Sequence, residues 1–200
     1  MKFFVFLVFS MGAALVAQHF LPPVPPWGAR VFLLPLVFLY GALSFSTAGM
    51  LVLAFLGGAM WDLVHGVWVE VHGAHGMHAG TGAEEVLELG VGWSVCAYAV
   101  LGAIGSGMRP LFLRGRWEVH CLFSGFATSV LTFLEYVLIS LRREPLHFEF
   151  SRSVWERVVG AGVTALVISP LVFAFLGYVA RWMGHRHYRP RLQREGGVHG

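Results

Sequence analysis

Long apolar stretches alternate with short polar ones along the whole chain. Six of them reach or approach the roughly 20 residues that an α-helix needs to cross the hydrocarbon core of a membrane. We therefore expect helices over residues 3–21, 31–45, 49–64, 89–108, 119–141 and 158–182. The prolines at 22–26 end the first helix, because proline cannot continue it. The predicted fold class is all-α, a polytopic membrane protein built as a six-helix transmembrane bundle.

Composition supports a membrane protein. Of the 200 residues, 56% are hydrophobic and only 12% are charged, whereas soluble domains usually carry about 25% charged residues. The first apolar stretch is longer than the roughly 7–15 residues of a signal-peptide core, and no small-residue cleavage site follows it, so we expect a retained helix. We expect residues 1–183 to form one transmembrane domain and the basic tail at 184–200 to be disordered.

The distribution of basic residues predicts the orientation. With the N-terminus in the cytoplasm, nine basic residues fall on the cytoplasmic side and five on the outer side, as the positive-inside rule favours. Both termini are then cytoplasmic, and the interval at 65–88, which holds no Lys or Arg, becomes an outer loop insertion. The linker at 142–157 opposes this orientation, because its four arginines lie outside.

The third apolar stretch, GMLVLAFLGGAMWDLVHG at 49–66, contains a carboxylate. An acid in hydrocarbon costs a few kcal/mol, so this helix is expected in the middle of the bundle with Asp62 turned inward. Gly57 and Gly58 let a neighbouring helix approach closely. Asp62 has two interpretations: a structural acid bonded to a neighbouring helix, or a contact for a proton, an ion or a partner. Glu135 in the fifth stretch poses the same choice, and the two acids could form one site.

Three histidines, His72, His75 and His78, are candidate metal ligands. Their spacing of three would place them on one helical face, and imidazole suits Zn, Cu or Ni. The glycines between 72 and 80 favour a loop instead, so we prefer an exposed polar loop and predict no metal and no cofactor. Cys96 and Cys121 are expected as apolar core thiols. No spacing joins a nucleophile, a base and oxyanion donors, which disfavours an enzyme.

Four motifs together resemble a known family: FLGGAMWDLVHG, GWSVCAYAVLGAIGSGMRPLF, LTFLEYVLISL and VISPLVFAFLGYVARWM. They resemble MreD, the integral membrane subunit of the bacterial rod-shape system, whose third helix reads approximately G-F-x-x-G-x-x-x-D and a later one G-Y-x-x-G. Gly58 and Asp62 match the first pattern; Tyr98 and Gly102 match the second, with Ala97 in place of its first glycine. Matches elsewhere are Glu135, an acid of the fifth helix, and Pro170, where a turn interrupts the last helix.

The resemblance implies a non-enzymatic subunit of the elongasome in the bacterial cytoplasmic (inner) membrane, which supports peptidoglycan elongation and cell shape. Its implied partners are an MreC-like protein and, through it, MreB, RodA and a class B penicillin-binding protein, besides membrane lipid; no nucleic acid is implied. The implied fold is similar to the six-helix substrate-binding subunits of energy-coupling-factor transporters. The interval at 65–88 departs from the family, which has a short turn there.

That similarity supplies the alternative function, a substrate-binding subunit of a vitamin or metal uptake transporter. Such a subunit needs a ligand cavity lined by several helices and an outer loop as a lid. Asp62 and the interval at 65–88, which is rich in His and Glu, would suit those roles.

Overall fold

The computed structural model describes residues 2–25, 27–75, 92–109, 117–142 and 151–184; side chains of residues 65–75, 117, 139 and 141–142 are outside this description. Every expected helix is present in this part of the chain: α1 Lys2–Phe20, α2 Leu34–Ser44, α3 Thr47–His75, α4 Trp93–Gly107, α6 Trp117–Arg142 and α7 Arg152–Trp182. No strand forms in these ranges; only an isolated bridge joins Val24 and Ala29. The all-α prediction is confirmed.

Four helices are long and apolar enough to cross a membrane: Lys2–Phe20, Thr47–Val64, Glu118–Leu138 and Arg152–Trp182. Two are shorter, with 11 residues in α2 and 15 in α4. At a rise of about 1.5 Å per residue, neither spans a hydrocarbon core of about 30 Å as a straight helix. The protein is therefore a helical membrane protein with four candidate spans among the described residues.

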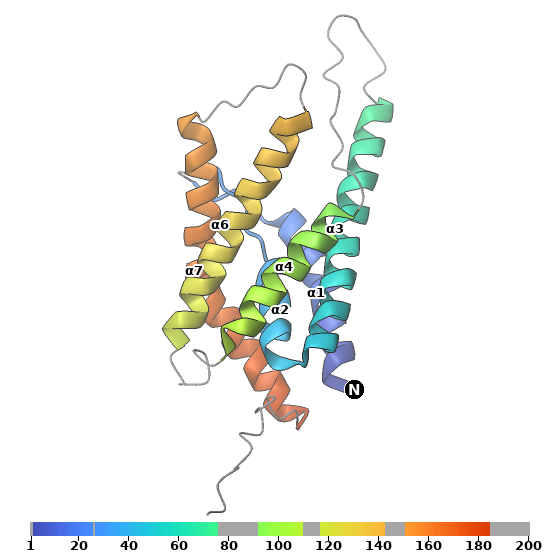
Figure 1. The fold of residues 1–200 in the computed structure, drawn as a ribbon. Helices are drawn as coiled ribbons and strands as arrows, with labels where there is room; N and C mark the ends of the chain where they lie inside the picture. Colours follow the sequence, from blue (N-terminus) through green and yellow to red (C-terminus); the bar gives the residue numbers. More distant parts are fainter. Residues whose placement is uncertain (1, 26, 76–91, 110–116, 143–150, 185–200) are drawn as a thin grey trace, which may run out of the picture.

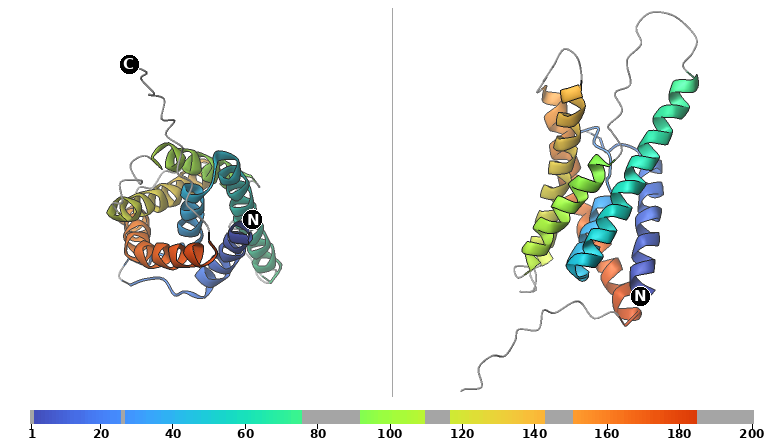
Figure 2. Two further views of the ribbon diagram at one scale, coloured as in Figure 1. Left: turned by 90° about the horizontal axis from the view of Figure 1, so that it is seen from below. Right: turned by 45° about the vertical axis from the view of Figure 1, so that its right-hand side comes forward.

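The centre of the bundle is α2, which corrects the expectation that the third helix occupies the middle. Figure 2 shows α2 surrounded by the other helices in the end-on view, and it contacts all five of them. Every α2 residue except Leu43 is buried. By contrast, α3 exposes Phe55 and Leu63. A short helix that is hydrophobic all round is stable only where neighbours cover every face.

The third helix continues beyond the expected end at residue 64. Its backbone is helical to His75, so the loop predicted from residue 65 does not begin there. Gly66 and Gly73 each cost roughly 1 kcal/mol relative to alanine. No proline lies between 47 and 75, and isolated glycines lower helix stability without ending the helix.

The last helix also begins earlier than expected, at Arg152 rather than at residue 158. Ser151 precedes it in an extended conformation. In the first turn, the Arg152 guanidinium contacts the Glu156 carboxylate at 2.7 Å, one helical turn further on. Such i,i+4 pairs contribute a few tenths of a kcal/mol to a helix, so charged residues of the expected linker extend the helix instead.

Pro170 does not interrupt α7, contrary to the expectation from the resemblance. The helix is continuous from Arg152 to Trp182, although its axis changes direction about halfway along (Figure 1). Proline has no N–H, so the carbonyl of Leu166 loses its usual helical donor. The hydroxyl of the buried Ser169 donates to that carbonyl at 3.0 Å. Because this bond replaces the lost one, the helix bends without breaking.

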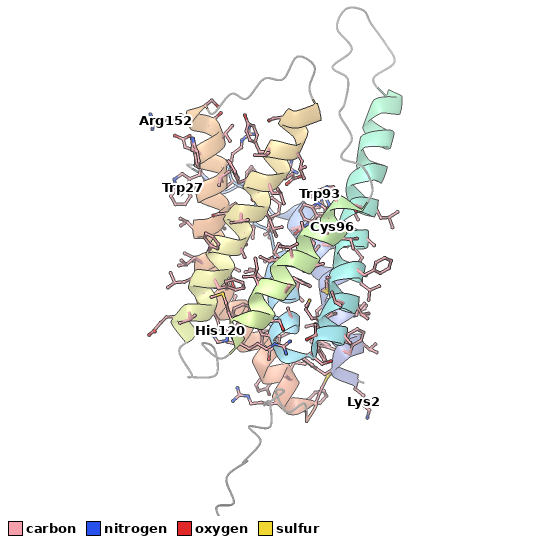
Figure 3. The ribbon with its side chains drawn as sticks, in the orientation of Figure 1. Lys2, Trp27, Trp93, Cys96, His120 and Arg152 are labelled. Carbon is pink, nitrogen blue, oxygen red and sulfur yellow. The ribbon has the colours of Figure 1, made fainter. Side chains whose placement is uncertain are left out.

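A basic residue lies at each end of the bundle. Lys2 at the start of α1 and the C-terminal end of α7 lie at one end, and Arg152 lies at the other (Figures 1 and 3).

Cys121 is buried, as expected, but Cys96 is exposed on α4, which corrects its assignment to the core. An exposed thiol on an apolar helix is compatible with a surface that faces lipid instead of water.

Candidate functional site

Asp62 on α3 is bonded to the start of α4. Its carboxylate oxygen Oδ2 accepts a hydrogen bond of 2.7 Å from the backbone N–H of Gly92. Gly92 precedes the first residue of α4 and has a φ of 106°, a left-handed conformation that glycine adopts without steric cost. The first N–H groups of a helix lack intrahelical partners and carry partial positive charge. Asp62 therefore holds the N-terminal end of α4 against α3, which is its structural interpretation.

The two glycines before Asp62 lie at different contacts. A Cβ atom on Gly58 would lie 2.5 Å from the backbone nitrogen of Val95 on α4, whereas one on Gly57 would meet only the terminal methyl of Met11. Backbone cannot yield as a flexible side chain can. Gly58 thus permits the backbones of α3 and α4 to touch, one turn away from the bond that Asp62 makes.

Tyr98 and Gly102 form a second contact, between α4 and the central helix. The Tyr98 ring packs edge-on against Phe38 of α2, with ring centroids 5.0 Å apart. A Cβ atom on Gly102, one turn later, would lie 3.0 Å from the Phe38 ring and would overlap the side chain of Met50 on α3. These two motif residues therefore fit α4 into the angle between α2 and α3.

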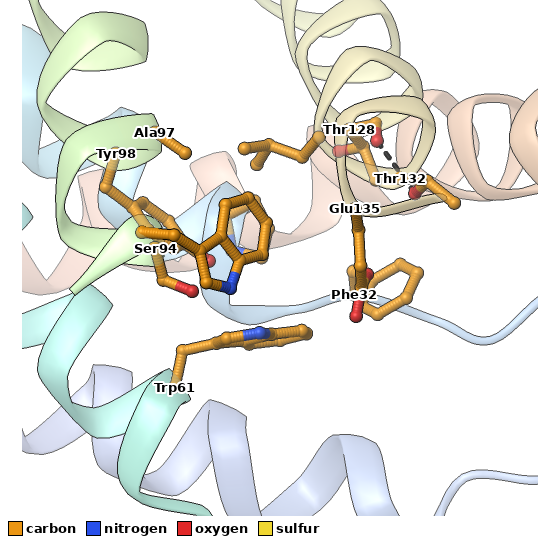
Figure 4. A pocket seen from close by; sticks show the side chains of 11 residues that line it. Phe32, Trp61, Ser94, Ala97, Tyr98, Thr128, Thr132 and Glu135 are labelled. Carbon is orange, nitrogen blue, oxygen red and sulfur yellow. Dashed lines mark hydrogen bonds between the residues drawn. The ribbon is translucent and has the colours of Figure 1, made fainter. Parts of the chain in front are cut away.

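Glu135 lies in a different place, on α6. It lines a cavity together with Tyr98, Ser94 and Trp61, which project from α4 and α3 (Figure 4). The room for a water-sized occupant is about 20 Å³, which is enough for about one water molecule. Asp62 does not line this cavity. The two acids are thus not joined in one site, and of the two only Glu135 lines this cavity.

The histidine candidates stay untested. His72 and His75 have helical backbone at the end of α3, but their side chains are outside the described part of the chain, as is all of His78. Within the described ranges, no group of three or more His, Cys, Asp or Glu side chains could hold a metal ion.

Arg109 forms hydrogen bonds to the end of α2, a structural role that the sequence analysis missed. Its guanidinium donates to the carbonyl of Ala42 at 2.7 Å and also to the carbonyl of Phe45. Both carbonyls lie at the C-terminal end of α2, where helical carbonyls lack donors and cations are favourable. The sequence signal was an arginine that directly follows an apolar stretch, which we used only to orient the protein.

A glycine contact between α6 and α7 was also missed. A Cβ atom on Gly125 would lie 2.9 Å from the carbonyl oxygen of Gly162, and one on Gly162 would lie equally close to the oxygen of Gly125. Beside them, the Ser129 hydroxyl donates to the carbonyl of Val158 at 3.1 Å. Small residues and interhelical hydrogen bonds of this kind join helices in membranes.

Comparisons with known proteins give no relative. No protein-family model, no curated protein and no solved structure matches this chain.

Proposed function

We propose that the protein is a non-enzymatic integral membrane subunit of the bacterial rod-shape complex, where it binds an MreC-like partner and supports peptidoglycan elongation. The observation that carries this proposal is the location of the four residues of the two MreD-like patterns. Gly58, Asp62, Tyr98 and Gly102 all lie where α4 packs on α2 and α3. Residues in such a position build a scaffold that presents helices to other membrane proteins.

The same proposal places six crossings in the bacterial cytoplasmic membrane with both termini inside. The described helices alternate in direction (Figure 1), and Lys2 lies at the end of the bundle where α7 finishes (Figure 3). The shorter α2 and α4 would be the other two of the six crossings. Arg109, at the C-terminal end of α2, then contributes to the cytoplasmic excess of positive charge.

Among the residues that the structure describes, cavity size favours this function over a vitamin transporter. Sites for small molecules usually measure about 300–1,000 Å³ and place a few polar groups around the ligand. The cavity at Glu135 accepts about 20 Å³. A larger groove of about 890 Å³ runs along α1 and α3, but apolar residues line it throughout. It offers no polar side chain to orient a vitamin.

The test is an affinity purification of the full chain from mildly solubilised membranes, with mass spectrometry of proteins and small molecules together. We expect an MreC-like protein to be recovered. The Asp62→Ala variant should insert but recover less of that partner, because the position of α4 depends on Asp62. The exposed Glu118 supplies the control, and Glu118→Gln should recover as much partner as the wild type. Recovery of an ATPase module with a bound vitamin or metal would overturn the proposal.

A further inference from the structure

The cavity at Glu135 has the walls of a site for a cation. It lies between α3, α4, α6 and the segment before α2. Four of its eleven lining residues are aromatic: Phe32 and Trp61, whose ring centroids are 5.7 Å apart, with Trp93 and Tyr98. Figure 4 shows Glu135 extending beside Phe32 toward the level of Trp61. Ring faces attract positive charge, and they do so more strongly where water is excluded.

Two polar groups in this cavity lack partners among the described residues. The Ser94 hydroxyl is buried, with 1% of the residue exposed, and has no hydrogen-bond partner. Glu135 forms no hydrogen bond or ion pair with any side chain that the structure describes. A buried hydroxyl without a partner, such as that of Ser94, costs about 1–3 kcal/mol, whereas Glu135 is partly exposed. An occupant that donates hydrogen bonds to both groups would remove that cost.

The two threonine hydroxyls at the cavity are already occupied, and that of Thr128 donates to the carbonyl of Ser124 at 2.8 Å. The Thr132 hydroxyl donates to the carbonyl of Thr128 at 2.9 Å, within α6 (Figure 4). Arg30 acts electrostatically on Glu135, but its own side chain is exposed. The Glu135 carboxyl and the Ser94 hydroxyl therefore stay available beside the aromatic rings, and together they favour a donor with positive charge.

The volume of the cavity limits which cationic groups can enter it. The available 20 Å³ fits one water-sized group. A primary ammonium group is about that size and has three N–H donors, whereas a trimethylammonium group is several times larger and has none. An alkyl chain attached to the ammonium would have to leave through the mouth of the cavity.

Depth in the membrane indicates where such a group would come from. Glu135 lies seven residues before Arg142, the next charged residue along α6, a distance of about 10 Å along a helix. Tryptophan is enriched near the headgroups at the membrane interface, and Trp61 and Trp93 both line the cavity. We propose that the cavity binds a primary ammonium group, carried by an aminophospholipid headgroup or a free alkylamine, with Glu135 as its counter-charge and Ser94 as a hydrogen-bond acceptor. This site goes beyond the proposed shape function and does not depend on it.

The test is a titration of the full chain in nanodiscs with ethylammonium chloride, followed by tryptophan fluorescence because Trp61 and Trp93 line the cavity. In phosphatidylcholine nanodiscs we expect saturable binding of ethylammonium and none of tetramethylammonium at equal ionic strength. Glu135→Gln should weaken binding at least about tenfold, the usual effect of losing a charged hydrogen bond. Ser94→Ala should weaken it by a smaller factor, and Glu118→Gln, an exposed acid at the start of the same helix, should not change it.

A second arm identifies the source of the ammonium group. If phosphatidylethanolamine occupies the cavity, nanodiscs that contain it will show weaker apparent binding of free ethylammonium, because lipid and amine compete. Equal binding in both lipids would make a free amine the ligand. Equal binding of tetramethylammonium and ethylammonium, or unchanged binding by both Glu135→Gln and Ser94→Ala, would overturn the proposal. The selectivity test uses the wild-type protein, so it holds even if a variant fails to fold.

Discussion

The carboxylate of Asp62 accepts a hydrogen bond of 2.7 Å from the backbone amide of Gly92, and this bond connects the middle of α3 to the residue that directly precedes α4. In a membrane the N-terminal amides of a helix need a partner from the protein, because hydrocarbon offers none. The Asp62 carboxylate and the Gly92 N–H would each be costly if they faced lipid, and the hydrogen bond between them satisfies both. The pairing explains why an acid is present in an otherwise apolar stretch.

Removing the Asp62 carboxylate should destabilise the protein. For Asp62→Ala we expect a loss of about 1–2 kcal/mol, typical of a lost N-terminal cap. Asp62→Asn should lose less, since the amide oxygen can still accept the Gly92 bond. Thermal unfolding in detergent, followed by circular dichroism, measures both. Equal melting temperatures for the wild type and Asp62→Ala would show that the bond does not hold α4.

Gly57 and Gly58 provide a matched pair of substitutions. Gly58→Ala should cost about 1–3 kcal/mol, the usual penalty of overpacking, because its methyl would overlap the backbone at Val95 and push α3 and α4 apart. Gly57→Ala should cost much less, since the Met11 side chain can move. The same melting experiment compares them. A larger loss in Gly57→Ala than in Gly58→Ala would contradict the packing of α3 on α4.

Ser169 and Pro170 should show strong coupling. Ser169→Ala removes the donor to the Leu166 carbonyl and leaves it unpaired, at a cost of about 1–3 kcal/mol. In a Pro170→Ala background the backbone amide of residue 170 can take that carbonyl, so Ser169→Ala should then cost little. A double-mutant cycle on unfolding free energy measures the difference. Additive effects of the two substitutions would refute the replacement of the lost helical bond by the hydroxyl.

Arg109 should stabilise the C-terminal end of α2. Arg109→Ala removes both hydrogen bonds to the carbonyls of Ala42 and Phe45, and we expect a loss of about 2 kcal/mol or more, since bonds to a charged donor are worth about 1.5–3 kcal/mol each. Arg109→Lys keeps the charge but not the planar arrangement of donors, so part of the loss should remain. Hydrogen exchange of the α2 amides reports the local effect. Unchanged protection in Arg109→Ala would show that α2 does not depend on this arginine.

Much of the fold followed from hydropathy, because the cost of exposing backbone polar groups in lipid leaves few alternatives to helices. The first helix ended at Phe20, one residue from the expected position. Boundaries next to charged or glycine-containing sequence were less accurate: α3 runs to His75 and α7 starts at Arg152. At these boundaries the end of the helix depends on single ion pairs and single glycines. Each of them changes the free energy of the helix by no more than about 1 kcal/mol, so the sequence pattern does not fix the end residue.

The site was only partly predictable. Sequence marked Asp62 and Glu135 as acids that need a partner, because a charge in hydrocarbon is costly wherever the helix lies. It could not tell that Asp62 binds Gly92 while Glu135 borders a cavity with Ser94. Arg109 contributed only to the prediction of membrane orientation, because its partners are backbone carbonyls 64 and 67 residues away along the chain. Backbone groups are the same in every residue, so no sequence pattern reveals which of them a side chain will meet.

The amino-acid sequence by itself determined that this chain forms apolar helices, and it marked which side chains are costly in a membrane. These properties depend on residue composition over windows of about 20 residues. Only the tertiary structure decided that α2 occupies the centre, that Gly58 lets α3 and α4 touch, and that the two acids are not joined in one site. Those outcomes depend on which helix faces meet, and lipid-exposed and protein-exposed faces are equally apolar, so hydropathy cannot distinguish them.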